Sequence, residues 1–306
     1  MSVSFEAERL ADLVDPELVV EALADGFSLT EGPVWHPSGF LLFSEIPSSS
    51  RMKWSGSGGL ETVEHPTNRG NGMALAPDGT LVVCEHETSC MVRLTLAEDG
   101  STVTRAVLAS HYGDDELNSP NDVVVRSDGT VFFTDPTYGR IHGWVGKVRE
   151  PELSVRAVYS ISEDGDLRQL ASDFNQPNGL CLSPDESLLY VNDSAEYHIR
   201  RFVIEADGTL SGGEVLIAGL GDPDETERGF CDGMKCDSSG NIWVTGPDGV
   251  WVVDSVGTLL GTVGTPEQVH NLTWGGEEFN QMYLMGSSAI YRFETKTTGA
   301  HRARSI

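Results

Sequence analysis

The chain has 306 residues, of which 47 are acidic and 20 basic, so its formal net charge is −27. Carboxylates in such excess would repel nucleic acid and anionic lipid headgroups, and both are excluded as partners. Hydrophobic residues make up 39% of the chain, and 34 glycines with 14 prolines indicate a folded protein with many tight turns between short strands.

The N-terminal residues do not have the composition of a secretory signal, because no basic stretch is followed by an apolar one. No apolar run approaches the roughly 18 residues that a membrane-spanning helix needs. The five cysteines show no repeated spacing, which is typical of free thiols in a reducing compartment. We therefore expect a cytoplasmic protein.

One polar residue, a strand, a turn and a second strand recur as a unit along the chain. In the first copy Glu31 precedes the apolar residues 32–35, the turn ends at Gly39, and residues 40–43 form a second apolar run. In the first five copies the polar residue lies eight positions before the same turn position. Each copy therefore predicts a β-hairpin. The equivalent polar residues of the six copies are Glu31, Asn71, Asn121, Asn178, Asp232 and Asn271.

Further strands follow each hairpin. A fourth strand is visible after most third strands, as at residues 167–170 and 259–263. The hairpins pair residues 31–35 with 40–43, 71–75 with 81–84, 121–125 with 131–134, 178–182 with 188–191, 232–236 with 242–244, and 271–274 with 282–285. The third strands are predicted at residues 52–54, 91–94, 158–161, 199–202, 250–253 and 290–293.

Six repeats of four antiparallel strands predict an all-β fold, a six-bladed β-propeller. The last copy has no fourth strand after Phe293, whereas residues 20–27 resemble residues 167–174, which precede Asn178. We therefore expect an N-terminal strand to complete the last blade and close the propeller. A closed propeller leaves no place for a domain boundary, so residues 1–306 are expected to form one domain, with an extension at 1–18, the propeller at 19–293 and a tail at 294–306.

The polar residues of the repeat stand where core strands usually carry apolar side chains. First strands line the central channel of a propeller, so these side chains are expected to surround one axis. One explanation is structural, because Asn tolerates unusual backbone geometry and bonds to local amides. The other is a cation on the axis, held by the carboxylates of Glu31 and Asp232 and by amide oxygens, a ligand set that suits Ca²⁺, Mg²⁺ or Mn²⁺.

More polar groups are expected at the channel entrance. Arg69 and His270 each stand close before a repeat residue, and a His there could be structural or functional. Arg69 could select a polar or anionic group of a substrate, or form a solvated ion pair. The other candidates are Glu85 and His86, Thr134 and Asp135 with Tyr138, and Asn192 and Asp193 with His198. No serine-hydrolase elbow, phosphate-binding loop or dinucleotide fingerprint competes with them.

Between about Glu21 and Phe293 the sequence resembles the senescence marker protein / gluconolactonase / luciferin-regenerating enzyme family of six-bladed propellers, and most closely its bacterial and fungal gluconolactonase branch. The resemblance rests on Glu31-Gly-Pro-Val-Trp35, Ser119-Pro-Asn-Asp122, Phe133-Thr-Asp-Pro136, Pro177-Asn-Gly179, Ser183-Pro-Asp185 and Asp232-Gly-Met234.

The resemblance implies a divalent cation held by Glu31, Asn178 and Asp232, with Asn121 as a further ligand or a substrate contact. Calcium is the first choice of metal, and Mg, Mn, Zn or Fe are alternatives. It also implies hydrolysis of sugar lactones. Animal members of the family carry an Arg where this chain has Ser119. Sugar hydroxyls must therefore be bound by other groups, for which Asn71, Arg69, Glu85, Tyr138 and Asp135 are the candidates.

These residues fit the chemistry of lactone opening. A cation on the carbonyl oxygen stabilises the negative charge that develops there. Asp232 is the expected base for the attacking water, and His86 or His270 could protonate the leaving hydroxyl or position the substrate. Two alternatives remain: a phosphotriesterase or fluorophosphatase that uses the same site, and a non-enzymatic propeller with a structural metal. We expect the protein to be a monomer or a dimer. Its expected ligand is a small-molecule lactone.

Overall fold

The structure, a computed structural model, describes residues 8–301. Six four-stranded antiparallel sheets account for most of this part of the chain, and the predicted fold class, a six-bladed β-propeller, is confirmed. The helices within residues 8–301 are the four-residue α1 (Tyr138–Ile141) and the 3-10 turns η1 (Glu8–Asp12) and η2 (Thr226–Arg228). None of them is long and apolar enough to cross a membrane.

The described residues divide into two compact units. The first unit comprises Glu31–Asn178, and the second comprises Gly179 to residue 301 together with the N-terminal residues up to Thr30. The predicted single domain, with its boundaries at residues 18 and 293, stays a prediction, and both ends of the chain lie outside the described residues.

In the first unit the strands fill three sheets in chain order, and a small hairpin precedes the third sheet. The sheets are β2 (Thr30–His36), β3 (Phe40–Glu45), β4 (Ser50–Ser55) and β5 (Gly59–Glu64); β6 (Gly70–Leu75), β7 (Leu81–Glu85), β8 (Cys90–Leu96) and β9 (Thr102–Ala109); and β12 (Val123–Val125), β13 (Val131–Asp135), β14 (Arg156–Ile161) and β15 (Leu167–Phe174), with the hairpin β10 (His111–Tyr112) and β11 (Asp115–Glu116).

The second unit also has three sheets, and the last of them takes one strand from the N-terminus. The sheets are β16 (Pro177–Leu182), β17 (Leu188–Asp193), β18 (His198–Ile204) and β19 (Leu210–Ala218); β20 (Met234–Cys236), β21 (Ile242–Gly246), β22 (Gly249–Val253) and β23 (Leu259–Gly264); and β24 (Val269–Gly275), β25 (Gln281–Gly286) and β26 (Ala289–Glu294) with β1 (Glu21–Asp25).

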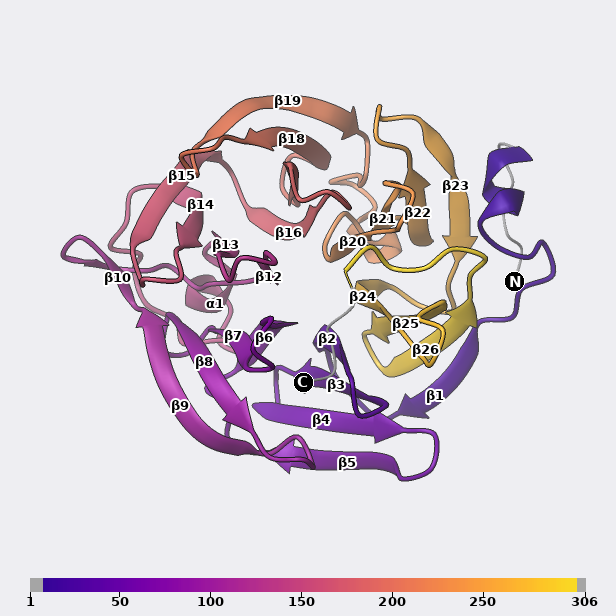
Figure 1. Ribbon diagram of the computed structural model, residues 1–306, viewed down its shortest axis with the longest axis horizontal. Helices are drawn as coiled ribbons and strands as arrows, with labels where there is room; N and C mark the ends of the chain where they lie inside the picture. The colour runs from indigo at the N-terminus through magenta and orange to yellow at the C-terminus, as the bar shows by residue number, and fades with distance from the viewer. Residues whose placement is uncertain (1–7, 302–306) are drawn as a thin grey trace. The chain divides into compact units, whose positions relative to one another are not determined.

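The strand that closes the last sheet is the one expected from the sequence. β1 pairs antiparallel with β26, and Ala22 lies opposite Tyr291. Figure 1 shows the indigo β1 running beside the yellow β26. The N-terminal segment is fixed further by Leu13, whose carbonyl oxygen accepts a hydrogen bond from the Lys296 backbone N–H at 2.7 Å.

The turns follow from the Asp and Gly that recur in the repeat. In the second copy Asp78 accepts a hydrogen bond from the Thr80 N–H at 3.0 Å, and Gly79 has a φ of 79°. The third copy repeats the bond with Asp128 and Thr130. The Asp side chain thus bends the backbone, and the glycine takes the left-handed conformation without a steric cost.

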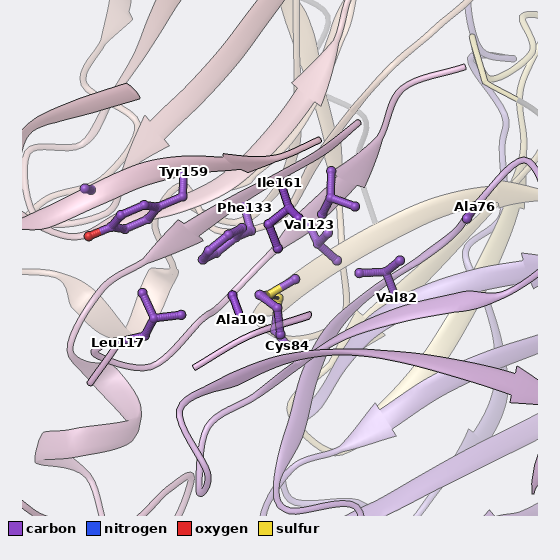
Figure 2. Packing of buried hydrophobic residues seen from close by; sticks show 12 residues of the cluster. Ala76, Val82, Cys84, Ala109, Leu117, Val123, Phe133, Tyr159 and Ile161 are labelled. Carbon is purple, nitrogen blue, oxygen red and sulfur yellow. Dashed lines mark hydrogen bonds between the residues drawn. The ribbon is translucent and has the colours of Figure 1, made fainter. Parts of the chain in front are cut away.

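The second strand of each sheet is apolar and buried, because it has neighbours on both sides within the sheet. All six residues of β3 are buried, whereas the outer strand β5 is largely exposed. One hydrophobic cluster of the first unit joins residues of β7, β13 and β14. Figure 2 shows its residues Cys84, Phe133 and Tyr159, and the rings of Phe133 and Tyr159 stack with centroids 5.3 Å apart.

Two predicted first strands are shorter than expected. β12 and β20 begin two residues after Asn121 and Asp232, so these two polar residues precede their strands. The sequence also did not predict the β10–β11 hairpin or the segment 136–155 between β13 and β14, which we call the insert and which contains α1. The predicted second and third strands of all six copies are confirmed.

Candidate active site

The repeat residues are shielded from solvent by the surrounding backbone. Asp232 is partly buried, and the other five are buried. Their backbone carbonyls accept hydrogen bonds from neighbouring strands: Ser44 Oγ donates to Asn71 O at 2.8 Å, and Thr134 Oγ1 donates to Asn178 O at 2.7 Å. These bonds fix the backbone from which the polar side chains project.

Glycines after two of the repeat residues permit close approach of the backbones in the second unit. A Cβ on Gly179 would lie 2.0 Å from the carbonyl oxygen of Asp232. A Cβ on Gly233 would lie 2.1 Å from Cγ of Asn271. Real Cβ contacts are never this short, so no larger residue fits at either position without displacing the polar residue beside it.

Some of the polar side chains bond to their own backbone. Oε2 of Glu31 accepts the N–H of Gly32 at 2.7 Å, and Oδ1 of Asn271 accepts the N–H of Leu272 at 2.8 Å. Local bonds of this kind are what the structural explanation of the polar register predicted.

Asp232 and His270, both predicted as catalytic residues, lie together in the second unit. Nδ1 of His270 is 3.5 Å from Oδ2 of Asp232, and its Nε2 is 2.9 Å from Oγ of Ser287. Asn192 supports the pair, because its Nδ2 donates to the Asp232 carbonyl oxygen at 2.5 Å. A carboxylate and an imidazole at this distance can exchange a proton through a small movement or through one water.

His86, also predicted as catalytic, lies in the first unit with both ring nitrogens engaged. Nδ1 is 3.1 Å from the backbone oxygen of Val145, and Nε2 is 3.2 Å from Nδ2 of Asn71. Burial lowers the pKa of His86 to about 4, opposed by the hydrogen bond to Val145 and assisted by the charge of Arg69. A neutral imidazole with both nitrogens bonded is a poor proton donor to a substrate.

Arg69 and Glu85, both predicted to bind substrate, make contacts within the protein. Nη1 of Arg69 donates to the carbonyl oxygens of Pro47 at 2.9 Å and Trp144 at 2.7 Å. The buried Glu85 carboxylate forms a two-pronged ion pair with Arg105, at 2.9 and 2.6 Å. Contacts of this kind hold loops in place.

Asp135 and Tyr138 flank the start of the insert. Asp135 is fully buried, and its Oδ2 accepts the N–H of Asn118 at 2.8 Å. Burial raises the pKa of Asp135 to about 7, although backbone hydrogen bonds from Asn118 and Ser119 and the charge of Arg140 act in the opposite direction. Tyr138 is the first residue of α1.

Three buried amide oxygens have no hydrogen-bond partner among the residues that the structure describes, and they are Oδ1 of Asn71, Oδ1 of Asn118 and Oδ1 of Asn192. An acceptor left in this state usually receives a bond from a ligand, an ion or a water. Within residues 8–301, no group of three or more His, Cys, Asp and Glu side chains could hold a metal ion. Amide oxygens were part of the predicted ligand set, and the buried oxygen donors on these strands suit a hard cation.

The sequence indicated Asn192 only as one of several loop candidates, and it did not predict the hydrogen bond from Asn192 to Asp232. Its position in the second strand matches that of Ser44 and Thr134, which make the equivalent bond to a neighbouring repeat residue. Alignment of the second strands would have identified it. The roles of Val145 and Arg140 had no such signal, because the insert occurs in one repeat only.

Comparison with known proteins places the chain in a family. The family model described as "SMP-30/Gluconolactonase/LRE-like region" matches residues 29–288 of the sequence. The chain belongs to this family. It is 31% identical to the gluconolactonase of Zymomonas mobilis over 95% of this chain and 85% of the relative, and 25% identical to a pentonolactonase of Haloferax volcanii over 90% and 94%. A gluconolactonase structure from Xanthomonas campestris, 29% identical, superposes with a TM-score of 0.86 over 96% of this chain and 95% of that one.

Proposed function

We propose that this family member is a lactonase, a carboxylic ester hydrolase that opens sugar lactones of the aldonolactone class. The observation that carries the proposal is similarity along nearly the whole chain to relatives named gluconolactonase and pentonolactonase. The pairing of Asp232 with His270 supports it, because ester hydrolysis needs both a proton acceptor and a proton donor.

We also propose that Glu31, Asn178 and Asp232 hold a divalent cation, with Asn121 as a further ligand or a substrate contact. The hard oxygen donors favour Ca²⁺, and Mg²⁺, Mn²⁺, Zn²⁺ or Fe²⁺ are the alternatives. Bound there, the cation would supply Lewis-acid stabilisation of the lactone carbonyl oxygen as it becomes negative.

The side chains of the second unit then perform the proton transfers. The Asp232 carboxylate accepts a proton from the water that attacks the carbonyl carbon. The proton then passes from Asp232 to His270 across their contact, and as the bond to the ring oxygen breaks, His270 gives it to that oxygen, which leaves as a hydroxyl group. The contact with Ser287 holds the imidazole of His270 in place for this transfer. The product is an open-chain hydroxy acid, so turnover releases acid.

A pH-indicator assay over a panel of glucono-, xylono- and arabinolactones tests the proposal. Asp232→Asn should lower kcat/KM by about 100-fold or more, because general acid–base groups typically contribute 10²–10⁴. Asp224→Asn, which changes an exposed carboxylate, is the matched control and should have no effect. Acid release that neither a chelator nor Asp232→Asn reduces would contradict the mechanism.

The same preparation separates the other candidate functions. Faster release of phenol or fluoride from phosphotriesters and fluorophosphates than of acid from lactones would favour the phosphotriesterase. Tight retention of one metal ion, measured by elemental analysis, with no hydrolysis of either class would favour a structural metal in a non-enzymatic propeller.

A further inference from the structure

His86 stands in the middle of a chain of hydrogen bonds that joins the insert to β6. The chain runs from the backbone oxygen of Val145 to Nδ1 of His86, and from its Nε2 to Nδ2 of Asn71. His86 is 1% exposed and Asn71 is 3% exposed, so water does not compete for these bonds. Each group must therefore match the donor or acceptor character of its neighbour.

The carbonyl of Val145 decides the tautomer of His86. A carbonyl oxygen can only accept a hydrogen bond, so Nδ1 of His86 carries the proton. In the neutral ring Nε2 then has only a lone pair and must accept from Asn71. The backbone of the insert thus determines which end of the Asn71 amide faces the imidazole.

The consequence is that Oδ1 of Asn71 points away from His86. It has no hydrogen-bond partner in the described part of the chain. A buried acceptor without a partner is destabilising, and turning the amide would not give Oδ1 a partner. That turn would place Oδ1 against the lone pair of Nε2, and His86 therefore prevents it.

The ring of His86 has no room to rotate away. A Cβ on Gly139 of α1 would lie 2.8 Å from both Cβ and Cγ of His86, so the helix packs directly on the imidazole. The backbone N–H of Gly139 donates to Oγ of Ser119 at 3.0 Å, which holds the helix in this position. Arg69 binds the carbonyl of Trp144, next to Val145, and fixes the same part of the insert.

We propose that His86 is a positioning residue and that Asn71, which it orients, accepts a hydrogen bond from a ring hydroxyl of the lactone. This inference rests on the proposed function, and it assigns the substrate class as hydroxylated lactones. A site built to bond a hydroxyl can reject the analogue without it by a factor of about 10⁴ or more, since the polar group is then left unpaired. His86 exerts its effect through Asn71 and does not touch the substrate.

A double-mutant cycle tests whether the effect of His86 on activity depends on Asn71. We expect His86→Phe and Asn71→Ala each to lower kcat/KM for gluconolactone by tenfold or more. The double variant should be no worse than Asn71→Ala alone, because His86 has no other route to the substrate. Against δ-valerolactone, which has no hydroxyl group, neither single change should matter. His111→Phe, on the exposed hairpin of the same unit, is the matched control.

A conservative variant keeps the test valid if His86→Phe does not fold. His86→Gln retains an acceptor that can reach Nδ2 of Asn71, so it should recover much of the activity on gluconolactone, and the cycle can be repeated with it. Additive losses in the cycle, or equal losses on δ-valerolactone, would overturn the inference and leave the lactonase standing.

The metal content of the Asn71→Ala variant distinguishes the two possible partners of the Asn71 Oδ1 atom, a substrate hydroxyl and a metal cation. Asn71→Ala should keep the metal content of the wild-type protein, measured by elemental analysis. Loss of metal in parallel with activity would show that Oδ1 serves a cation and would overturn the assignment to a hydroxyl. A wild-type protein that opens no lactone of the panel would overturn the proposed function and this inference together.

Discussion

The polar side chains of the repeat are of two kinds at the scale of single residues. Glu31 and Asn271 accept the next backbone N–H in the chain, and this local bond stabilises the strand end. Asn71, and Asn192 beside Asp232, keep a buried oxygen without a partner among the described residues. Two residues of the same repeat register, Asn271 and Asn71, therefore differ, because the side-chain oxygen of one bonds locally and that of the other has no partner in the described part of the chain.

Two buried groups of the first unit respond to pH in opposite directions. The pKa of His86 is lowered from 6.5 to about 4, so between these values the unfolded chain binds the extra proton and acidification destabilises the fold. The pKa of Asp135 is raised from 3.8 to about 7, so the folded chain binds the extra proton and acidification favours folding. Between about pH 4 and 6.5 the two effects largely cancel.

Asp135→Asn should remove the stabilisation on acidification that comes from protonation of Asp135. We expect the free energy of unfolding of the variant, relative to wild type, to fall by about 1.4 kcal/mol per pH unit between pH 6.5 and 5. The substituted amide oxygen can still accept the Asn118 N–H, so the local structure is retained. Denaturant unfolding at four pH values measures the effect, with Asp224→Asn as the control. Parallel pH curves for Asp135→Asn and wild type would refute it.

The sequence named candidate site residues, but it did not predict the contacts that these residues make. Asp232 and His270 were both predicted, but their contact joins residues of different repeats and is absent from any local pattern. The partner of His86 lies in the insert, which has no counterpart in the other repeats to suggest its course. Residue type and register could thus be predicted, whereas tautomers and partners required the tertiary structure.

At the scale of single elements, the turn between β20 and β21 is held by one buried carboxylate. Oδ1 of Asp237 accepts the N–H groups of Ser239 and Asn241, both at 2.9 Å. Its Oδ2 accepts Nδ2 of Asn241 at 2.9 Å and Nε1 of Trp243 at 3.1 Å. One side chain therefore fixes both the turn and a large aromatic residue of the core.

Asp237→Ala should lower the free energy of unfolding by roughly 3–5 kcal/mol, because it leaves several donors, including the buried indole N–H, without an acceptor. Asp78→Ala removes the equivalent turn bond at an exposed position and should cost less than about 1 kcal/mol. Thermal and denaturant unfolding of the two variants gives the comparison. Similar losses in both would show that the turn bond, and not the buried network, dominates.

Most elements could be predicted because their strands alternate with a turn motif that has a local physical cause. The exceptions have physical reasons too. β12 and β20 begin late, although the backbone before β12 still bonds to β13 through the Asn121 N–H and the Thr134 oxygen at 2.9 Å. The insert is held by Arg140, whose buried guanidinium bonds to Glu116 and Asn118, residues distant in sequence.

At the scale of the whole molecule, the net charge of −27 should oppose folding through self-repulsion. We expect the melting temperature to rise steadily as NaCl increases from 10 to 500 mM, since the screening length falls from about 30 Å to under 10 Å. KCl should act in the same way. Micromolar Ca²⁺ should give a separate rise that a chelator reverses and that Asp232→Asn loses, because only a specific site saturates at low concentration. A melting temperature independent of NaCl would contradict this account.

The pairing of β1 with β26 has a consequence for synthesis on the ribosome. Residues 21–25 are made long before their partners 289–294, so β1 has no partner strand until β26 has emerged. Until then β1 has unpaired edges, which favour association with other nascent chains. A circular permutant in which β1 is translated after β26 should shorten that exposed interval.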